Sequence, residues 1–203
     1  MPGLYLLDQA GADALRRFVA DGGTAIMTAY SAKVNENNQW YDTPLPGRLT
    51  DVFGLRTSEF YDAGTLVTEV GGEDVKGEIG FYEVLEPSTA EVLARFSNVD
   101  GTPPSITVNR FGKGRAIYVG TPAQPRIMRP LYRQLYASLG IAPGPKTPEG
   151  VYARAVEGRV LYVNTTGEAR DVTIDGTMSG VLSGKRWTGT LRLEPLGADL
   201  LER

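Results

Sequence analysis

Residues 106–121 read Ile-Thr-Val-Asn-Arg-Phe-Gly-Lys-Gly-Arg-Ala-Ile-Tyr-Val-Gly-Thr, the pattern of a strand, a tight turn and a second strand. Ile106 and Val108 alternate with polar neighbours on the first arm, and residues 116–119 form a continuous apolar run on the second. Residues 112–114, Gly-Lys-Gly, stand between the arms and supply the positive backbone angles that a short turn needs. The segment therefore predicts a β-hairpin.

The N-terminal residues predict a crossover unit. Residues 4–7 and 24–30 are two short apolar runs, and residues 9–21 between them carry apolar side chains on one helical face: Ala12, Leu15, Phe18 and Val19. Asp8 fits the N-cap of this helix, and Gly22-Gly23 fits a left-handed stop. Strand, helix and strand in this order predict a crossover within a parallel sheet, and hence an α/β domain.

Further elements follow on both sides of the hairpin. We expect a short helix over residues 49–53 that Gly54 ends, and strands over residues 55–60, 65–70, 82–85 and 91–96. After the hairpin, residues 126–139 repeat apolar side chains in helical register: Ile127, Leu131, Leu135 and Leu139. This helix completes the predicted α/β domain, which we place at residues 1–143.

Residues 140–150 read Gly-Ile-Ala-Pro-Gly-Pro-Lys-Thr-Pro-Glu-Gly, and their prolines and glycines interrupt any regular element. Beyond this stretch the pattern changes to short alternating strands, which we expect at residues 151–156, 159–163, 169–174, 180–182 and 190–193. The sequence therefore predicts a domain boundary and, over residues 144–203, a small antiparallel β domain.

Composition excludes several kinds of chemistry, because the 203 residues include neither histidine nor cysteine. A Ser-His-Asp or Cys-His nucleophile cannot be built, nor can zinc sites of the usual Cys/His kind or haem ligation by these residues. We therefore expect no metal site and no cofactor. Any catalysis would depend on carboxylates, lysine, tyrosine, serine or threonine.

Charge and hydropathy favour a cytoplasmic protein without nucleic-acid or membrane partners. The formal net charge is −3 and the pI is about 5.1, and no long block of Lys and Arg is present. No apolar stretch has the length of a membrane span, and the N-terminus lacks the pattern of a signal peptide. Residues 1–7 look like an entry into the middle of a fold, so a truncated chain and a natural stand-alone protein both stay open.

Five segments together resemble successive landmarks in the glycoside hydrolase family 42 β-galactosidases, in the region that follows their catalytic barrel. They occur in family order across nearly the whole chain. The segments are residues 22–28 (Gly-Gly-Thr-Ala-Ile-Met-Thr), 31–37, 46–54 (starting Pro-Gly-Arg-Leu), the hairpin at 106–121, and 148–151 (Pro-Glu-Gly-Val).

The resemblance implies an α/β trimerisation domain, with a flavodoxin-like or glutamine-amidotransferase-like fold, followed by the small β domain. It also implies that the catalytic carboxyl pair lies on a barrel of the same or a neighbouring chain, outside this sequence. We therefore expect a non-catalytic assembly and support region, and no galactoside hydrolysis by this chain alone. Homo-oligomerisation as a trimer is the expected assembly. The family's use of the domain as a trimer contact, together with apolar and aromatic residues on the last predicted helix, suggests an interface at Leu131, Tyr132, Leu135 and Tyr136.

Residues 31–46 favour a second interpretation. Asn35, Asn38, Trp40 and Tyr41 place amides beside aromatic rings directly after a predicted strand, at the edge of an α/β sheet where ligand loops lie. Aromatic faces and amides are the groups that bind sugars. Two alternatives stay open: a carbohydrate-binding module that uses residues 35–41, and a surface loop whose Trp40 packs inward or contacts another subunit.

An independent enzyme that uses carboxylates is a third class of function. The candidates are Glu36, Asp42, Asp51, Glu59 and Asp62, and such an enzyme would need two of them together in an enclosed site. Nothing in the sequence places two of them together, and most acidic side chains stay exposed. Trp187 in the β domain suggests a further sugar contact, but we interpret it as a core or hinge residue.

Overall fold

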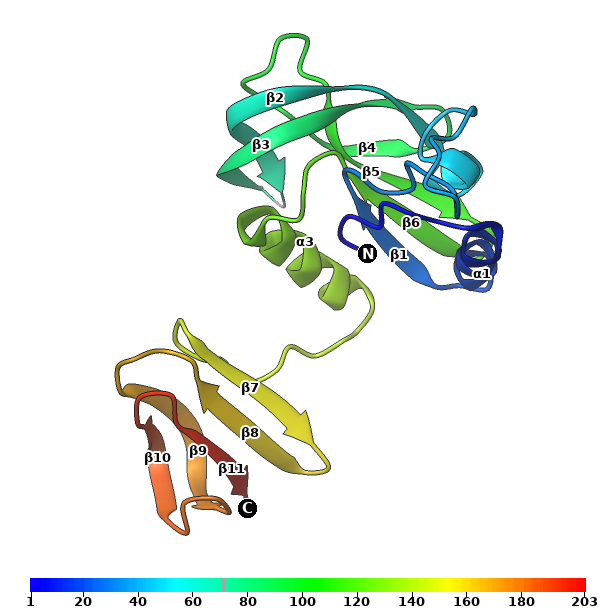
Figure 1. Cartoon of the computed structure of the whole chain (residues 1–203). Coiled ribbons are helices and arrows are strands. Elements are labelled where there is room, and N and C mark those ends of the chain that lie inside the picture. Colours follow the sequence, from blue (N-terminus) through cyan, green and yellow to red (C-terminus); the bar gives the residue numbers. More distant parts are fainter. Residues whose placement is uncertain (71) are drawn as a thin grey trace. The chain divides into compact units, whose positions relative to one another are not determined.

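The computed structural model describes residues 1–70 and 72–203, with residues 73, 78 and 79 described by their backbone alone. The chain divides into two compact units, Met1–Leu135 and Tyr136–Arg203, and each is described by itself (Figure 1). Between Ser138 and Val151 the described chain has no helix or strand. The predicted boundary between residues 143 and 144 falls in this stretch, but the two units separate at Leu135, within the last helix, so the boundary stays a prediction.

The first unit is built on a four-stranded sheet in the order β1, β6, β5, β4. The bounds are β1 Thr24–Thr28, β4 Glu91–Arg95, β5 Pro104–Phe111 and β6 Gly114–Val119. β1 and β6 are parallel, and the other two neighbouring pairs are antiparallel. β5 and β6 form the two arms of the predicted hairpin, with Ile106 opposite Val119 and Phe111 opposite Gly114. The hairpin prediction is therefore confirmed.

Helix α1 (Gln9–Ala20) precedes β1 and begins where the sequence predicts. The Asp8 carboxylate accepts a hydrogen bond from the backbone N–H of Gly11 at 2.7 Å, which satisfies one of the free donors of the first turn. At the other end, Gly22 has a φ of +117° and the N–H of Gly23 donates to the carbonyl of Phe18 at 2.9 Å. The N-cap at Asp8 and the stop at Gly22-Gly23 are both confirmed.

The β5–β6 turn packs backbone to backbone on the end of α1. Gly112 takes the first loop position with a φ of +59°, and the N–H of Lys113 donates to the carbonyl of Ala20 at 2.9 Å. A Cβ atom on Gly114 would lie 2.2 Å from the carbonyl oxygens of both Val19 and Gly23. Glycine is therefore required here by the close approach of two backbones.

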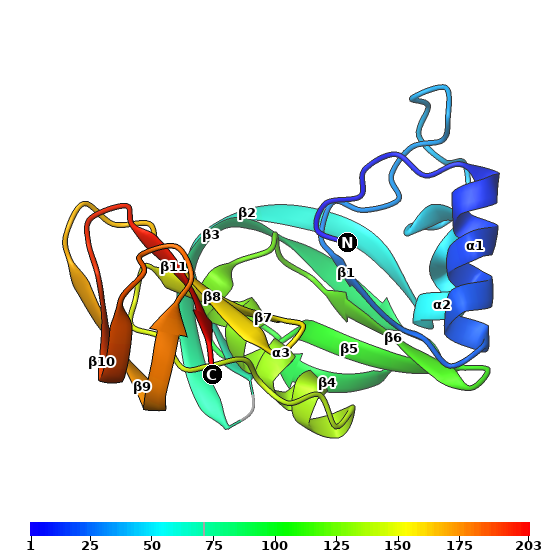
Figure 2. The same ribbon diagram turned by 90° about the horizontal axis from the view of Figure 1, so that it is seen from below.

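Helices cover both faces of the sheet. On one face Met27 and Tyr118 pack with α1 and the short helix α2 (Thr50–Phe53), and on the other Ile117 and Val119 pack with α3 (Pro125–Ser138). In Figures 1 and 2, α1 and α2 lie on the same side of the unit, away from α3. This arrangement confirms an α/β unit. A flavodoxin-like sheet is essentially parallel, whereas here β1 and β6 form the only parallel pair among the named strands of the described chain.

The helices near residues 49–53 and 126–139 are also confirmed. A 3₁₀ turn (Gly47–Leu49) leads into α2, and Gly54 closes it in the left-handed conformation with a φ of +63°. Ile127, Leu131 and Leu135 of α3 are all buried in the core of the first unit.

The expected strand at residues 4–7 is wrong. Leu6 makes an isolated parallel bridge to Val34, and the carbonyl of Leu4 accepts from the N–H of Ala32 at 2.7 Å. The segment therefore lies beside the chain that leaves β1, outside the four-stranded sheet. The residues are apolar as the sequence shows, but hydrophobicity does not reveal which neighbour covers them. The parallel partner of β1 is therefore β6 and not the segment at residues 4–7.

A long two-stranded ribbon, β2 (Leu55–Val70) and β3 (Glu73–Pro87), replaces three of the short strands that the sequence predicts. Gly64 and Gly80 interrupt the apolar pattern and suggest breaks, yet the two strands pair along almost their whole length. The ribbon bends over the sheet, as Figure 1 shows. Backbone pairing continues on both sides of Gly64, with Ala63 opposite Gly80 and Thr65 opposite Glu78, so the two strands remain one antiparallel ribbon.

The second unit contains a five-stranded antiparallel sheet in the order β10, β9, β11, β8, β7. The bounds are β7 Val151–Val156, β8 Arg159–Asn164, β9 Arg170–Gly180, β10 Arg186–Leu193 and β11 Ala198–Glu202. The expected strand at residues 180–182 is wrong, since residues 181–183 form a turn, and the sequence pattern missed β11. Trp187 is half-buried and its Nε1–H donates to Asp199 at 2.9 Å, as expected of a core residue.

No helix in the described part of the chain has the length and hydropathy needed to cross a membrane.

Candidate functional site

The turn that follows β1 has the most unusual backbone of the first unit. Tyr30 and Ala32 have φ angles of +66° and +51°, a left-handed conformation that costs energy for residues other than glycine. The hydroxyl of Ser31 between them accepts from the N–H of Leu4 at 3.0 Å. The turn lies at the carboxyl end of the strand that pairs in parallel with β6, which is where α/β sheets place their sites.

A buried carboxylate on β3 holds this turn. Glu83 is 1% exposed, and its Oε1 accepts from the N–H of Tyr30 at 3.0 Å and lies 2.7 Å from the Nζ of Lys33. Its Oε2 accepts from the hydroxyl of Tyr118 at 2.7 Å. Lys33 Nζ donates in addition to the hydroxyl of Thr57 at 3.2 Å. Four segments of the chain therefore meet at Glu83, and each of its carboxylate oxygens has a partner.

The electrostatics of this network suit positioning. Burial, followed by the negative charge of Glu83, raises the pKa of Tyr118 well above its usual value, so the phenol stays protonated and donates. A buried ion pair is costly to desolvate, and it persists where geometry and additional hydrogen bonds compensate. Both carboxylate oxygens of Glu83 already have protein partners, so the network leaves no free group for a substrate. It fixes the backbone of Tyr30 and the start of the segment that Lys33 begins.

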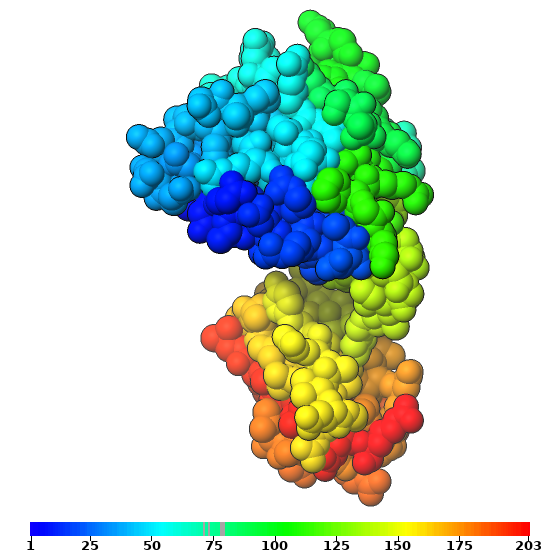
Figure 3. Space-filling view, turned by 90° about the vertical axis from the view of Figure 1, so that its right-hand side faces the viewer, coloured from blue at the N-terminus to red at the C-terminus, as the bar shows by residue number. Residues whose placement is uncertain are grey.

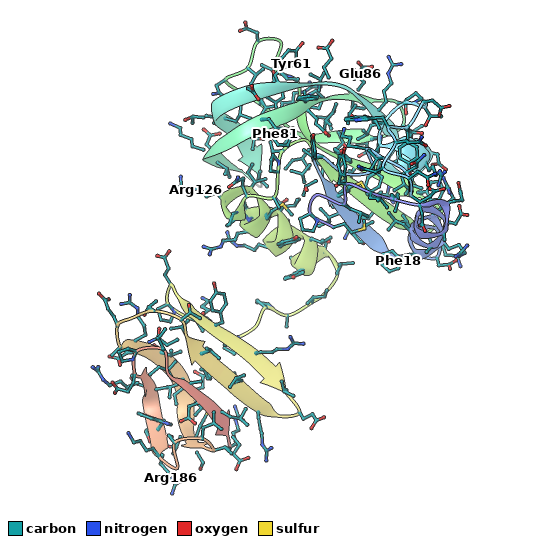
Figure 4. The ribbon with its side chains drawn as sticks, viewed as in Figure 1. Phe18, Tyr61, Phe81, Glu86, Arg126 and Arg186 are labelled. Atoms are coloured by element: carbon teal, nitrogen blue, oxygen red, sulfur yellow. The ribbon has the colours of Figure 1, made fainter. Side chains whose placement is uncertain are left out.

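Three aromatic rings are in contact next to this network, with that of Tyr30 between those of Tyr5 and Phe81. The rings of Tyr5 and Tyr30 stack with centroids 5.4 Å apart, and the rings of Tyr30 and Phe81 meet in a T-shaped contact with centroids 5.6 Å apart. Tyr30 is 39% exposed despite these contacts. Phe81 belongs to the β2–β3 ribbon, where Figure 4 labels it, so this ring contact joins the ribbon to the turn after β1. The strained turn therefore presents aromatic surface, a composition typical of binding surfaces.

Residues 31–46 project from the first unit next to the N-terminal residues, as the space-filling view in Figure 3 shows. Asn35 stabilises this projection from within, because its Oδ1 accepts from the backbone N–H groups of Asn37 at 2.9 Å and Gln39 at 3.1 Å. Asn38 adopts a φ of +58° and its N–H donates to the carbonyl of Asn35. Both predicted amides therefore serve the conformation of the loop.

The two aromatic residues of the loop differ. Tyr41 donates its hydroxyl to the carbonyl of Leu7, and its ring packs on Gly47 and under the Arg48 guanidinium at 5.4 Å. Trp40 is 53% exposed. A hollow of about 450 Å³ is lined by seven residues, Asn35, Gln39, Trp40, Tyr41, Asp42, Thr43 and Arg48. The structure therefore brings together three of the four predicted sugar-binding residues and leaves Asn38 outside.

The predicted interface residues on α3 separate into two pairs. Leu131 and Leu135 are 4% and 9% exposed and pack in the core of the first unit, so their side chains serve the fold. Tyr132 and Tyr136 are 37% and 42% exposed. A role in assembly stays a prediction for the two tyrosines.

The five carboxylates offered by the sequence are all exposed. Glu36 pairs with Arg48 at 3.5 Å and Asp51 with Arg16 at 3.0 Å, while Asp42 borders the hollow at Trp40. No cluster of carboxylates that could hold a metal ion is present in the described part of the chain. The sequence analysis missed the buried acid Glu83, because its partner Lys33 lies fifty residues away in the sequence. A charged residue within the apolar stretch Ile79–Leu85 was the available signal.

Residues 1–142 match the β-galactosidase trimerisation domain family. Among curated proteins, β-galactosidase BglY of Alicyclobacillus acidocaldarius is 30% identical over 219 residues, an alignment that covers 100% of this chain and 32% of BglY. β-Galactosidase BgaB of a Geobacillus species is 32% identical over 153 residues, covering 74% of this chain and 23% of BgaB.

Solved structures show the same relationship. The β-galactosidase of Bacillus circulans sp. alkalophilus superposes with a TM-score of 0.84 at 27% identity, covering 100% of this chain and 32% of that enzyme. Gan42B, a GH42 β-galactosidase from G. stearothermophilus, superposes with a TM-score of 0.83 at 25% identity, covering 100% of this chain and 31% of that enzyme. The chain thus spans about a third of the length of the β-galactosidases that it matches from end to end. Because this family model matches residues 1–142, which include the whole α/β sheet and the turn after β1, the chain belongs to the β-galactosidase trimerisation domain family.

Proposed function

We propose that this chain is the non-catalytic assembly and support region of a β-galactosidase-like glycoside hydrolase. The match of residues 1–142 to the trimerisation domain family carries the proposal. A retaining glycosidase needs two carboxyl groups about 5 Å apart across the sugar ring. The five candidate carboxylates are instead exposed, and Glu83 is committed to an internal network, so we assign catalysis to a barrel outside this sequence. The finer likeness of the α/β unit to glutamine amidotransferases stays part of this proposal.

Three exposed surfaces, two on the first unit and one on helix α3, are available to a second and third copy. The first is an apolar groove between the N-terminal segment and α1, where Leu6 is 45% and Phe18 is 53% exposed. The second is the ribbon, where Phe60 is 57% exposed. The third is the pair Tyr132 and Tyr136 on α3. Exposed aromatic and aliphatic side chains of this kind are the usual anchors of subunit contacts.

Light scattering at rising concentration tests the assembly. We expect the mass to approach three times the 21.9 kDa of one chain, around a three-fold axis with one heterologous patch repeated. Phe18→Ser, Phe60→Ser and the double variant Tyr132→Ala/Tyr136→Ala, each checked for folding by circular dichroism, identify the surface involved. A chain that stays monomeric at the highest concentration, or that dimerises through the β unit alone, contradicts the proposal.

The exposed Trp40 favours sugar binding as a second candidate function. Its ring stands at a hollow with Gln39, Asp42 and Arg48, a combination of aromatic face and hydrogen-bonding groups that suits a saccharide. Asn35, Asn38 and Tyr41 make hydrogen bonds within the protein that hold the loop. Sugar binding at this hollow would therefore depend mainly on Trp40. Trp40→Ala would then abolish binding of lactose observed by saturation-transfer NMR, whereas Phe60→Ala, an equally exposed aromatic elsewhere, would leave it unchanged.

A further inference from the structure

Three Asp-Gly dipeptides occur in the chain, at residues 21–22, 100–101 and 175–176, and the sequence contains no Asn-Gly. An Asp-Gly backbone rearranges readily, because glycine has no side chain to hinder the attack of its amide nitrogen on the preceding carboxyl group. All three dipeptides are exposed to solvent. Exposure therefore does not distinguish them, and the backbone around each one determines its reactivity.

Asp100 and Gly101 are the two central residues of a turn between β4 and β5. The N–H of Thr102 donates to the carbonyl of Val99 at 2.9 Å, and Gly101 has a φ of +74°, which is the pattern of a type II turn. The N–H of Gly101 and the carboxylate of Asp100 have no hydrogen-bond partner in the described part of the chain. A Cβ atom on Gly101 would meet nothing within 4 Å, so the reacting groups have room to move.

The other two dipeptides lie in more tightly bonded backbone. At the end of α1, the N–H groups of residues 21, 22 and 23 all donate to carbonyls of the last turn of the helix, at 2.9, 3.0 and 2.9 Å. Asp175-Gly176 lies within β9, and the residues on both sides of it are paired with β10. Rotation of the aspartate backbone would break several of these bonds, whereas at Asp100 it breaks the single bond of the turn.

The rearrangement needs no reactant other than water. The Gly101 nitrogen attacks Cγ of the protonated Asp100 carboxyl, a C–N bond forms as a C–O bond breaks, and the amide proton leaves with the hydroxyl as water. The resulting succinimide ring then takes up one water molecule. When that water opens the ring at the former backbone carbonyl of Asp100, the chain continues through Cγ. Asp100 is then an isoaspartate, with one additional methylene group in the backbone.

The position of this turn gives the rearrangement a structural effect. Asn98, just before the turn, holds the ribbon, because its Oδ1 accepts from the N–H of Val67 and its Nδ2 donates to the carbonyl of Thr65, both at 2.8 Å. Directly after the turn, the carbonyl of Pro103 accepts from the N–H of Phe96 at 3.0 Å. An additional methylene between these two anchors changes the length of chain that joins them, so the contact with β2 weakens.

We propose that Asp100-Gly101 is the preferred site of isoaspartate formation in the folded chain, and that the conversion loosens the contact of residues 96–103 with β2. This inference does not depend on the assembly or on the sugar binding proposed above.

Incubation of the full chain at neutral pH and body temperature, followed by isoaspartyl methyltransferase labelling and tryptic mapping, tests the site. The three dipeptides fall on separate tryptic peptides, residues 18–33, 96–110 and 171–185. We expect about tenfold more isoaspartate in peptide 96–110 than in either of the others, because fewer backbone hydrogen bonds must open there. In urea, where the backbone is unfolded, the three peptides should label alike.

Two variants and one further measurement complete the test. Asp100→Glu retains the charge but would have to form a six-membered ring, so the labelling of peptide 96–110 should disappear. Asp21→Glu is the matched control and should leave that labelling unchanged. In incubated protein the amide of Val67 should exchange with deuterium several-fold faster than in fresh protein, because it loses its bond to Asn98, and Asp100→Glu should prevent this change.

Equal labelling of the three peptides in the folded chain would overturn the proposal, as would preferential labelling of 18–33 or 171–185. A folded chain that forms no isoaspartate, while the chain in urea does, would show that the turn protects Asp100. Unchanged exchange of the Val67 amide in fully converted protein would refute the effect on the ribbon.

Discussion

Glu83 shows how much one buried side chain organises in this protein. Its two oxygens join the turn after β1, the segment that begins at Lys33, and strand β6 through Tyr118. The ion pair between Arg56 and Glu86 joins only two neighbouring strands of the ribbon and is open to solvent. Both pairs join a cation to a carboxylate, but only the buried pair leaves an uncompensated charge in the interior when one partner is removed.

Glu83→Gln should therefore be strongly destabilising. The substitution preserves shape but leaves the Lys33 ammonium buried without a counter-charge, for which we expect a loss of about 3–5 kcal/mol in the free energy of unfolding. Urea unfolding followed by circular dichroism measures it. Arg56→Gln is the control and should leave the midpoint unchanged. An equal midpoint for Glu83→Gln and the original chain would show that the network does not hold the turn.

Asp199 makes the stability of the second unit dependent on pH. Burial alone would raise the pKa of this carboxyl, but hydrogen bonds from Ser183 and Trp187, together with backbone N–H groups, outweigh burial and lower it. Since the pKa is lower in the folded state, the stabilisation is present above the unfolded value of about 3.9 and is lost as the pH falls through the folded value.

The fluorescence of Trp187 measures this dependence, in a Trp40→Phe background where it is the one remaining tryptophan. We expect the unfolding free energy of the second unit to fall as the pH decreases below about 4, the ordinary pKa of an Asp carboxyl in the unfolded chain. Asp199→Asn should cost about 1–3 kcal/mol at neutral pH, because buried donors lose part of their acceptor, and should flatten the acid limb. An unchanged acid limb in Asp199→Asn would assign the effect to other carboxyls.

At the scale of elements, the contact between the β5–β6 turn and the end of α1 joins hairpin and helix without side chains. Gly114 makes the approach possible because a Cβ there would lie 2.2 Å from two carbonyl oxygens. Gly64 in the middle of β2 is different, since a Cβ there would meet nothing within 4 Å. The two glycines look alike in the sequence and differ only in what surrounds them.

Gly114→Ala should therefore destabilise the first unit by about 1–3 kcal/mol or more, because the hairpin must move away from α1. Gly64→Ala should be neutral or slightly stabilising, because alanine restricts the unfolded chain and clashes with nothing. Guanidinium unfolding of both variants provides the comparison. Similar midpoints for the two would contradict the close packing of the β5–β6 turn on α1.

At the scale of the whole molecule, the proposed function predicts an absence of catalysis. The purified chain should not hydrolyse aryl galactosides, because its exposed candidate carboxylates do not provide the enclosed pair that a retaining glycosidase requires. A sensitive chromogenic assay at high protein concentration checks this. Turnover that persists through purification and disappears in Asp42→Asn, at the hollow beside Trp40, would assign a catalytic role to this chain.

Much of the local structure follows from the sequence alone. The β5–β6 hairpin, the N-cap at Asp8, the left-handed stop at Gly54 and the helix near residues 126–139 are present as predicted. Each depends on hydrogen bonds or backbone angles within a few residues, so the pattern of neighbouring residues contains the necessary information. The resemblance to the β-galactosidases also rests on such local segments, and the family match bears it out.

Tertiary structure alone decided which partner each apolar or charged residue meets. Residues 4–7 are apolar, yet they lie beside the chain near Val34 and not in the main sheet, and Leu131 and Leu135 pack in the core of the first unit. The ion pair of Lys33 with Glu83 joins residues fifty positions apart. Periodicity shows which face of an element avoids water, but the same face can be buried by the chain itself or by another copy, and only the folded arrangement distinguishes them.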